Sequence, residues 1–145
     1  MNHGTYRMYN QIDINTSNPL KIVLMMYDGS INFLKKAVEY AENKDIKNKN
    51  IYVNKARDII LELNNALNME ASEEIAGSLR KLYFFMNRRL IEASWSDDAK
   101  RLIEEVAQLL SSLKEGWQDA YNQQAGVDPG PQISNERISS LRYSA

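Results

Sequence analysis

Apolar residues recur every three or four positions in four successive stretches of this 145-residue chain. The stretches cover residues 20–38, 53–67, 75–86 and 99–120. This spacing places the apolar side chains along one side of an α-helix. Each helix therefore has one apolar face, and only the other three helices can cover it. The pattern predicts an all-α protein, an antiparallel up-and-down four-helix bundle.

Polar residues predict where the first two helices begin and end. Asn18 can accept a hydrogen bond from a free first-turn N–H, and Pro19 fits the first helical position because its missing N–H would be unpaired there. We expect this helix to run to about Glu42. The polar stretch 43–50 then predicts a connection, and the second helix should cover about residues 51–68.

Serine caps predict the other two helices. Ser72 can cap the third, followed by two glutamates, and Ser96 can cap the fourth, followed by two aspartates. Short connections at 69–71 and 94–96 favour antiparallel neighbours. Glycines and prolines in 125–131 should end the fourth helix near Gln124.

The chain therefore divides into three parts. We predict an N-terminal cap segment at 1–18, the four-helix bundle at 19–124, and a flexible linker and tail at 125–145. The tail is polar, with a weak helical pattern at Ile138 and Leu141.

Charge argues against a nucleic-acid partner. The formal net charge is -1, from 18 Lys and Arg against 19 Asp and Glu, so the molecule has no long-range field to hold a polyanion. Six lysines cluster locally but alternate with acids, which predicts a solvated polar face rather than a basic patch. These lysines are Lys35, Lys36, Lys44, Lys47, Lys49 and Lys55.

The cysteine content and the absence of secretion signals indicate where in the cell the protein works. There is no cysteine, which removes disulfides and thiolate sites. The polar first eleven residues lack a signal-peptide core, and no stretch approaches the roughly 20 apolar residues of a membrane span. We expect a cytoplasmic protein without membrane insertion.

Catalytic signatures are missing. A di-iron bundle needs repeated Glu-x-x-His motifs, yet the only histidine is His3. Adjacent acids at 73–74 and 97–98 are explained by helix starts, and those at 104–105 fall between apolar positions. We therefore predict no enzyme and no metal site.

Aromatic residues point to an interface instead. Tyr83, Phe84 and Phe85 are consecutive on a predicted helix, so they point about 100° apart and one buried stripe cannot hold all three. At least one should lie at a helix boundary or face solvent. A wide buried stripe and a partner groove both remain open, and the same applies to the methionines.

Several segments resemble the flagellar export chaperone FliS family, in order and with plausible spacing over about residues 6–121. The segments are Tyr9-Asn10-Gln11-Ile12, Asn18-Pro19, Leu24-Met25-Met26-Tyr27-Asp28-Gly29, residues 59–67 (IILELNNAL), residues 82–93 (LYFFMNRRLIEA), residues 105–110 (EVAQLL) and Gly116-Trp117. Phe84 and Phe85 depart from the family, which often has a more polar pair there.

The resemblance implies a cytosolic bundle that binds the disordered C-terminal segment of flagellin. It implies that the chaperone prevents premature polymerisation and delivers the subunit to the flagellar type III export apparatus, without a cofactor. Export-gate or regulatory proteins are further expected partners. The alternative is a non-catalytic regulatory bundle that forms a homodimer through its aromatic surface.

We expect the partner-binding surface to use apolar residues of the last three helices. The candidates are Ile60, Leu63, Leu67, Tyr83, Met86 and Trp117, although several could prove to be core. Tyr6 and Tyr9 are candidates in the N-terminal segment, which in the family resembles a latch over the substrate site; a fixed cap is the alternative. Residues 138–142 look like a flagellin C-terminus and could mimic substrate, or the tail could simply be solvated.

Overall fold

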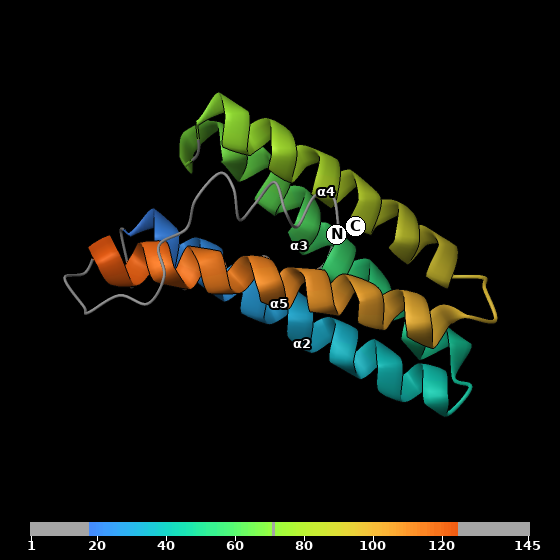
Figure 1. Ribbon diagram of the computed structural model, residues 1–145. Helices are drawn as coiled ribbons and strands as arrows, with labels where there is room; N and C mark the ends of the chain where they lie inside the picture. The colour runs from blue at the N-terminus through green and yellow to red at the C-terminus, as the bar shows by residue number, and fades with distance from the viewer. Residues whose placement is uncertain (1–17, 71, 125–145) are drawn as a thin grey trace.

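A computed structural model describes residues 18–70 and 72–124, and within these ranges the chain forms four helices and no strand. They are α2 (Pro19–Glu42), α3 (Ile46–Glu70), α4 (Glu73–Ala93) and α5 (Ala99–Gln124). The four helices run up and down beside one another (Figure 1). The predicted all-α antiparallel bundle is confirmed.

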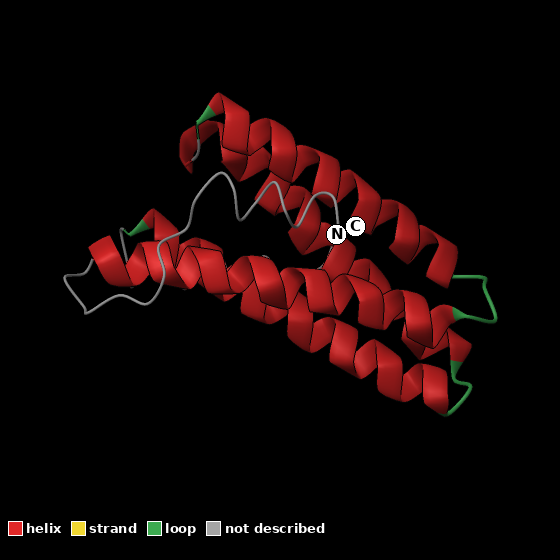
Figure 2. Cartoon of the chain, in the orientation of Figure 1, coloured by secondary structure: helices red, strands yellow, loops and turns green. Residues whose placement is uncertain are grey.

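Each helix packs against two neighbours. α2 lies against α3 and α5, and α4 lies against the same two helices from the other side. Figure 1 shows the α3–α4 pair and the α2–α5 pair drawing together toward the end that carries the 43–45 and 94–98 connections. In Figure 2 the turns that join the described helices are short, as an up-and-down bundle requires.

Two of the predicted N-caps are present. The Asn18 side chain accepts from the Leu20 N–H at 3.0 Å, and the Ser72 hydroxyl accepts from the Ile75 N–H at 3.3 Å. The predicted cap at Ser96 is wrong by two residues: α5 begins at Ala99 after Asp98, and the Ser96 hydroxyl accepts from the Asp98 N–H at 3.0 Å in the turn before it. These bonds satisfy N–H groups that have no partner inside a helix, which is why the helices start there.

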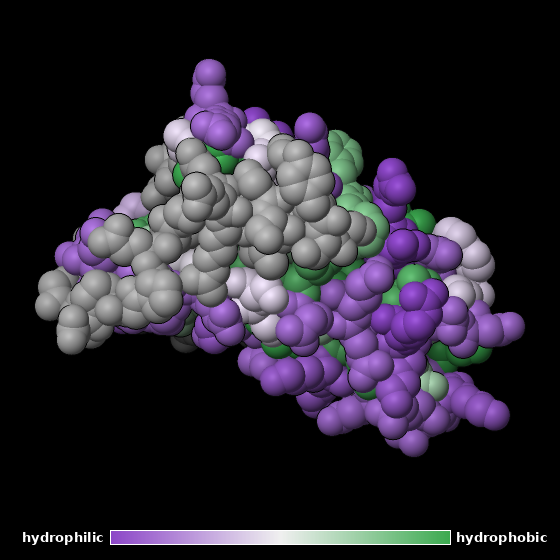
Figure 3. Space-filling view, viewed as in Figure 1, coloured by the Kyte–Doolittle hydropathy of each residue, from purple (hydrophilic) through white to green (hydrophobic). Residues whose placement is uncertain are grey.

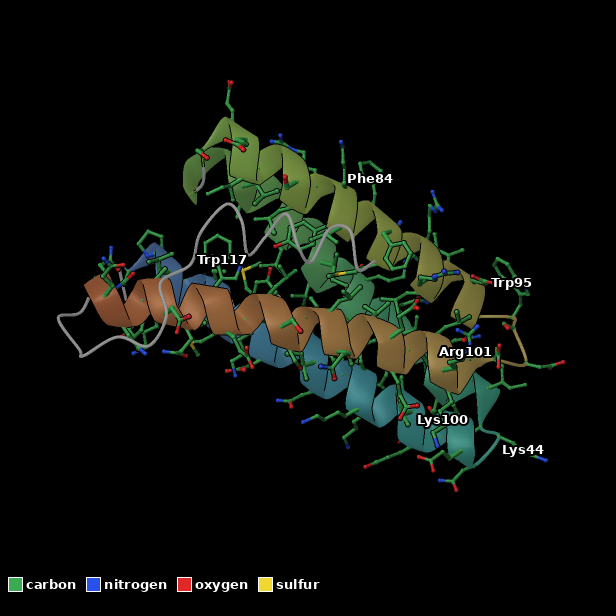
Figure 4. The ribbon with its side chains drawn as sticks, viewed as in Figure 1. Lys44, Phe84, Trp95, Lys100, Arg101 and Trp117 are labelled. Carbon is green, nitrogen blue, oxygen red and sulfur yellow. The ribbon has the colours of Figure 1, made fainter. Side chains whose placement is uncertain are left out.

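The predicted start of the second helix is wrong by about one turn. α3 begins at Ile46, because the Asp45 side chain accepts from both the backbone and the side-chain nitrogen of Asn48, at 3.2 and 2.8 Å. Lys44 adopts a positive φ of 58°, which reverses the chain just before this cap (Figure 4). The polar stretch that predicts a loop is therefore mostly helix, since Asp45 supplies a cap that composition does not reveal.

The prediction of a solvated lysine face is also wrong at one position. Lys49 is only 4% exposed, and its Nζ donates to the carbonyl oxygen of Ala93 at 2.7 Å. That carbonyl belongs to the last turn of α4, where backbone acceptors lack partners and the helix dipole favours a cation. Asn50 donates to the Ser94 carbonyl at 3.3 Å. The start of α3 thus closes the C-terminal end of α4, while burial lowers the pKa of Lys49.

The core is one continuous apolar cluster from all four helices. It contains most of the predicted stripe residues, among them Leu34, Leu82 and Leu110, and also takes in neighbours off the stripes such as Ile59; all four are fully buried. Hydrophilic residues cover most of the described α5 side in Figure 3, with apolar residues visible between them. The bundle therefore presents the polar exterior and apolar interior that its sequence pattern predicts.

The three consecutive aromatics separate as expected. Tyr83 is buried, Phe85 is half-buried beneath the Arg89 guanidinium at 4.9 Å from its ring centroid, and Phe84 is 65% exposed. One helix face cannot hold all three, because successive side chains point about 100° apart.

Candidate partner-binding surface

A shallow apolar groove of about 50 Å³ lies where α3 meets α4. Its floor holds Ile60 and Tyr83, which belong to the buried core. Its apolar walls are Leu61 on α3, 50% exposed, and Phe84 on α4, 65% exposed. We call this set, with the flanking amides of Asn64 and Asn87, the α3–α4 groove. Two large exposed apolar side chains beside buried ones make it a surface that a partner could cover.

Polar contacts fix one end of this groove. The Arg57 guanidinium donates to the Asn87 side-chain oxygen at 2.8 Å and to that of Asn54 at 3.3 Å. At the groove itself, the Asn64 side-chain oxygen is buried without a hydrogen-bond partner in the described part of the chain. A bound backbone could supply the missing donor after a rotation of that amide.

A second, larger hollow follows the outer side of α2 and α5. Its main part has a volume of about 750 Å³ and is lined by charged and amide side chains around Ile31. The Lys114 ammonium and the Asp28 carboxylate form an ion pair across it. A neighbouring part of about 300 Å³ has an apolar floor that includes Leu34 and Val38. This hollow is more polar than the α3–α4 groove.

All six predicted partner-binding residues in the described ranges are buried. Ile60 and Tyr83 form the floor of the α3–α4 groove, so their outer edges lie nearest to a bound partner. The other four lie within the core: Leu63, Leu67, Met86 and Trp117. Tyr6 and Tyr9 lie outside the described residues, as does the tail from residue 125.

Three of the buried aromatics join α2, α4 and α5 through hydrogen bonds. The hydroxyls of Tyr27 and Tyr83 are 2.5 Å apart, and Trp117 Nε1 donates to the Tyr27 oxygen at 3.0 Å. The rings of Tyr27 and Trp117 are tilted at 42° with centroids 6.5 Å apart. Burial raises the pKa of both tyrosines well above the ordinary phenol value. This cluster satisfies its own polar groups and holds the helix that carries Phe84 in place.

The sequence prediction missed Leu61 and did not single out Phe84. Leu61 falls between two core positions of α3, Ile60 and Leu63, so the helical pattern alone marks it as an off-stripe leucine. An apolar residue off the buried stripe, opposite an aromatic on the next helix, is the signal that could have identified the groove.

No described helix combines the length and apolar character needed to cross a membrane. Among residues 18–70 and 72–124, no three His, Cys, Asp or Glu side chains come together in a way that could hold a metal ion. The surface features available to a ligand in these ranges are grooves and exposed apolar side chains.

Comparison with known proteins identifies the family. The sequence profile described as "Flagellar protein FliS" matches residues 1–124. The chain belongs to the FliS family. Individual FliS relatives agree with this assignment. The flagellar secretion chaperone FliS of Bacillus subtilis is 35% identical over 115 residues, which cover 79% of this chain and 84% of the relative.

Two further FliS relatives come from other bacteria. The flagellar secretion chaperone FliSB of Pseudomonas aeruginosa is 36% identical, over 77% of this chain and 90% of the relative. The flagellar secretion chaperone FliS of Salmonella typhimurium is 34% identical, over 77% of this chain and 85% of the relative. The resemblance found in the short sequence segments is therefore confirmed.

Proposed function

We propose that this FliS-family protein is a cytoplasmic export chaperone that binds the C-terminal segment of flagellin. By covering that segment it prevents early polymerisation and keeps the subunit ready for the flagellar type III secretion apparatus. The role is one of binding and release, without catalysis. Relatives named flagellar secretion chaperones support it.

The α3–α4 groove is the surface that we assign to flagellin. The single observation that carries this assignment is the pairing of exposed Leu61 with exposed Phe84 over the buried Ile60 and Tyr83. An amphipathic helix can lay its apolar face into such a groove. The flanking amides of Asn64 and Asn87 can pair with polar groups of the bound segment.

Because the predicted residues are buried, the test of this proposal uses the exposed residues of the groove instead. Met86 and Trp117 are buried in the core and do not line the groove, so a charge there would damage the bundle rather than the binding surface. Leu61 and Phe84 can carry a charge at little cost to folding because water already reaches them. Binding and folding can therefore be separated experimentally.

The test measures binding of purified flagellin to the full chain and to two groove variants, Leu61→Asp and Phe84→Asp. A charge facing an apolar partner should weaken binding about thirtyfold or more, the size seen for central interface residues. Flagellin lacking its C-terminal segment should not bind the wild-type chain. Calorimetric titration gives the affinity, and thermal unfolding checks that each variant is folded.

Ile51→Asp provides the matched control. Ile51 is also an apolar residue of α3, is 41% exposed and does not line the groove. It should bind flagellin as the wild type does. Equal affinity in all three variants would remove the groove from the proposal. A wild-type chain that ignores flagellin but forms stable dimers would favour the regulatory alternative.

A further inference from the structure

The two most exposed aromatic side chains of the described residues lie on α4 and in the turn that directly follows it. Phe84 is 65% exposed and Trp95 is 70% exposed. They are eleven positions apart in the sequence, and three turns of a facing helix hold about as many residues and rise about 16 Å. Trp95 lies two residues past the end of α4 at Ala93, in a turn where its N–H donates to the Glu92 carbonyl at 3.2 Å. Figure 4 shows the Phe84 ring projecting from α4 on the side away from α5, and the Trp95 ring just beyond the C-terminal end of α4.

Two exposed cations flank Phe84 along α4. Lys81 and Arg88 are exposed, three positions before Phe84 and four positions after it. Neither has an ion-pair partner in residues 18–70 and 72–124, whereas Arg89 pairs with Glu105 at 3.0 Å. The sequence contains no acid between Glu74 and Glu92. We call Lys81, Phe84, Arg88 and Trp95 the α4 stripe.

We propose that the α4 stripe binds an acidic amphipathic α-helix of a second protein partner. Two aromatic anchors eleven positions apart match apolar residues at the same separation on a facing helix. Acidic residues between those anchors would meet Arg88, and an acidic residue beyond the anchor at Phe84 would meet Lys81. Aromatic residues and arginine are enriched where proteins bind one another, and complementary charge sets the register of the partner.

Charge decides against the other occupants. A second copy of this chain, packed stripe to stripe, would place Lys81 and Arg88 against the same cations. An anionic bilayer would meet exposed Asp97 and Asp98 beside Trp95. Two unpaired cations also neutralise too few phosphates to hold nucleic acid. An acidic helix can avoid these conflicts, because it need carry acids only beside Lys81 and Arg88 and can place an apolar residue at Trp95, away from Asp97 and Asp98.

This inference does not depend on flagellin binding. Phe84 belongs to both surfaces, but Arg88 and Trp95 lie outside the lining of the α3–α4 groove. Variants at these two positions therefore test the α4 stripe alone. Leu61→Asp tests the groove alone, so either proposal can fail while the other stands.

The experiment uses the full chain and a synthetic helical peptide of about 16 residues, long enough to span three turns. The peptide carries leucines eleven positions apart with glutamates between them, and a second peptide has lysines in place of the glutamates. Fluorescence anisotropy measures binding. Trp95→Ala and Arg88→Glu should each weaken binding of the acidic peptide about tenfold or more.

Lys35→Glu is the matched charge control, because Lys35 is an exposed cation on α2. It should bind the acidic peptide like the wild type, and higher salt should weaken binding in both. Equal affinity for the lysine peptide, unchanged binding in Trp95→Ala and Arg88→Glu, or no binding by the wild type would overturn the proposal. Trp95-dependent binding to phosphatidylglycerol vesicles without binding to the peptide would show a membrane surface instead.

Discussion

At the scale of single residues, burial of polar groups shapes this bundle as much as apolar packing does. Tyr27, Tyr83 and Trp117 place two hydroxyls and an indole N–H inside the core, and each finds its partner there. A buried polar group without a partner costs about 1–3 kcal/mol. The network therefore holds α2, α4 and α5 in one relative position, and it does so through side chains that also fill the core.

The buried tyrosines predict a loss of stability at high pH. Their pKa values are raised in the folded state by burial, so above about pH 10 the unfolded chain loses phenolic protons that the folded chain keeps. Stability is complete below that pH and falls above it by about 1.4 kcal/mol per pH unit for each tyrosine. Burial lowers the pKa of Lys49. Between its lowered pKa and the ordinary lysine pKa, this residue therefore makes stability rise with pH, the opposite of the effect of the tyrosines.

Urea unfolding from pH 9 to 11, followed by circular dichroism, measures this effect in the wild type and in Tyr83→Phe. The variant should start about 1 kcal/mol less stable, because it lacks one hydrogen bond. Its stability should then fall less steeply above pH 10, since one titrating group is gone. Parallel curves for the two proteins would show that Tyr83 does not keep its proton in the folded state.

At the scale of elements, α4 combines a well-defined beginning with an unusual end. Ser72 caps its start, while its last carbonyls are closed by Lys49 from α3 rather than by a glycine of its own. The same helix carries one wall of the α3–α4 groove and three residues of the α4 stripe, and the fourth, Trp95, follows in the next turn. A helix that is held at both ends and by core aromatics can present surface side chains in fixed positions.

Gly77 is the weak position within α4. A Cβ added there would meet no atom within 4 Å, and glycine inside a helix costs up to about 1 kcal/mol relative to alanine. Gly77→Ala should therefore raise the free energy of unfolding by about 0.5–1 kcal/mol, measured by urea unfolding at neutral pH. Flagellin affinity should not change, because Gly77 does not line the groove. A less stable variant would mean that the helix needs glycine there.

At the scale of the whole molecule, the bundle has more than one surface able to take a partner. The α3–α4 groove and the α4 stripe lie on one side, and the polar hollow between α2 and α5 lies on another. Separate surfaces would let a chaperone hold its substrate while a second protein contacts α4. The sequence predicts that the N-terminal segment controls the first of these events.

We predict that deleting residues 1–11 leaves flagellin affinity equal or higher. In the intact chain, the segment that holds Tyr6 and Tyr9 is expected to act as a latch that competes with flagellin for the groove. If this latch occupied the groove nine-tenths of the time, the apparent affinity for flagellin would be about tenfold lower than without it. Titration with purified flagellin checks this, with circular dichroism as the folding control. A clear drop in affinity with an intact helical signal would show that the segment contributes contacts instead.

The sequence by itself determined the helices and most of their ends. Apolar periodicity marks the buried stripes, and Asn18 and Ser72 act through bonds to residues two or three positions away. Such signals are local, so they can be read without knowing the neighbours. The missed start of α3 was also local, but the capping role of Asp45 was hidden within a polar stretch.

Tertiary structure decided how wide each buried stripe is, and so which apolar residues at its edges lie inside and which remain exposed. Ile60 and Leu61 are adjacent and similar in chemistry, yet one is buried and the other is half-exposed, and Tyr83 and Phe84 divide in the same way. Lys49 is buried because its ammonium packs against the C-terminal end of α4 and donates to the Ala93 carbonyl. A helical pattern gives the direction of each side chain around its own axis. Which of these directions is covered depends on how closely the neighbouring helices pack. Packing therefore sets the boundary between the buried core and the exposed surface.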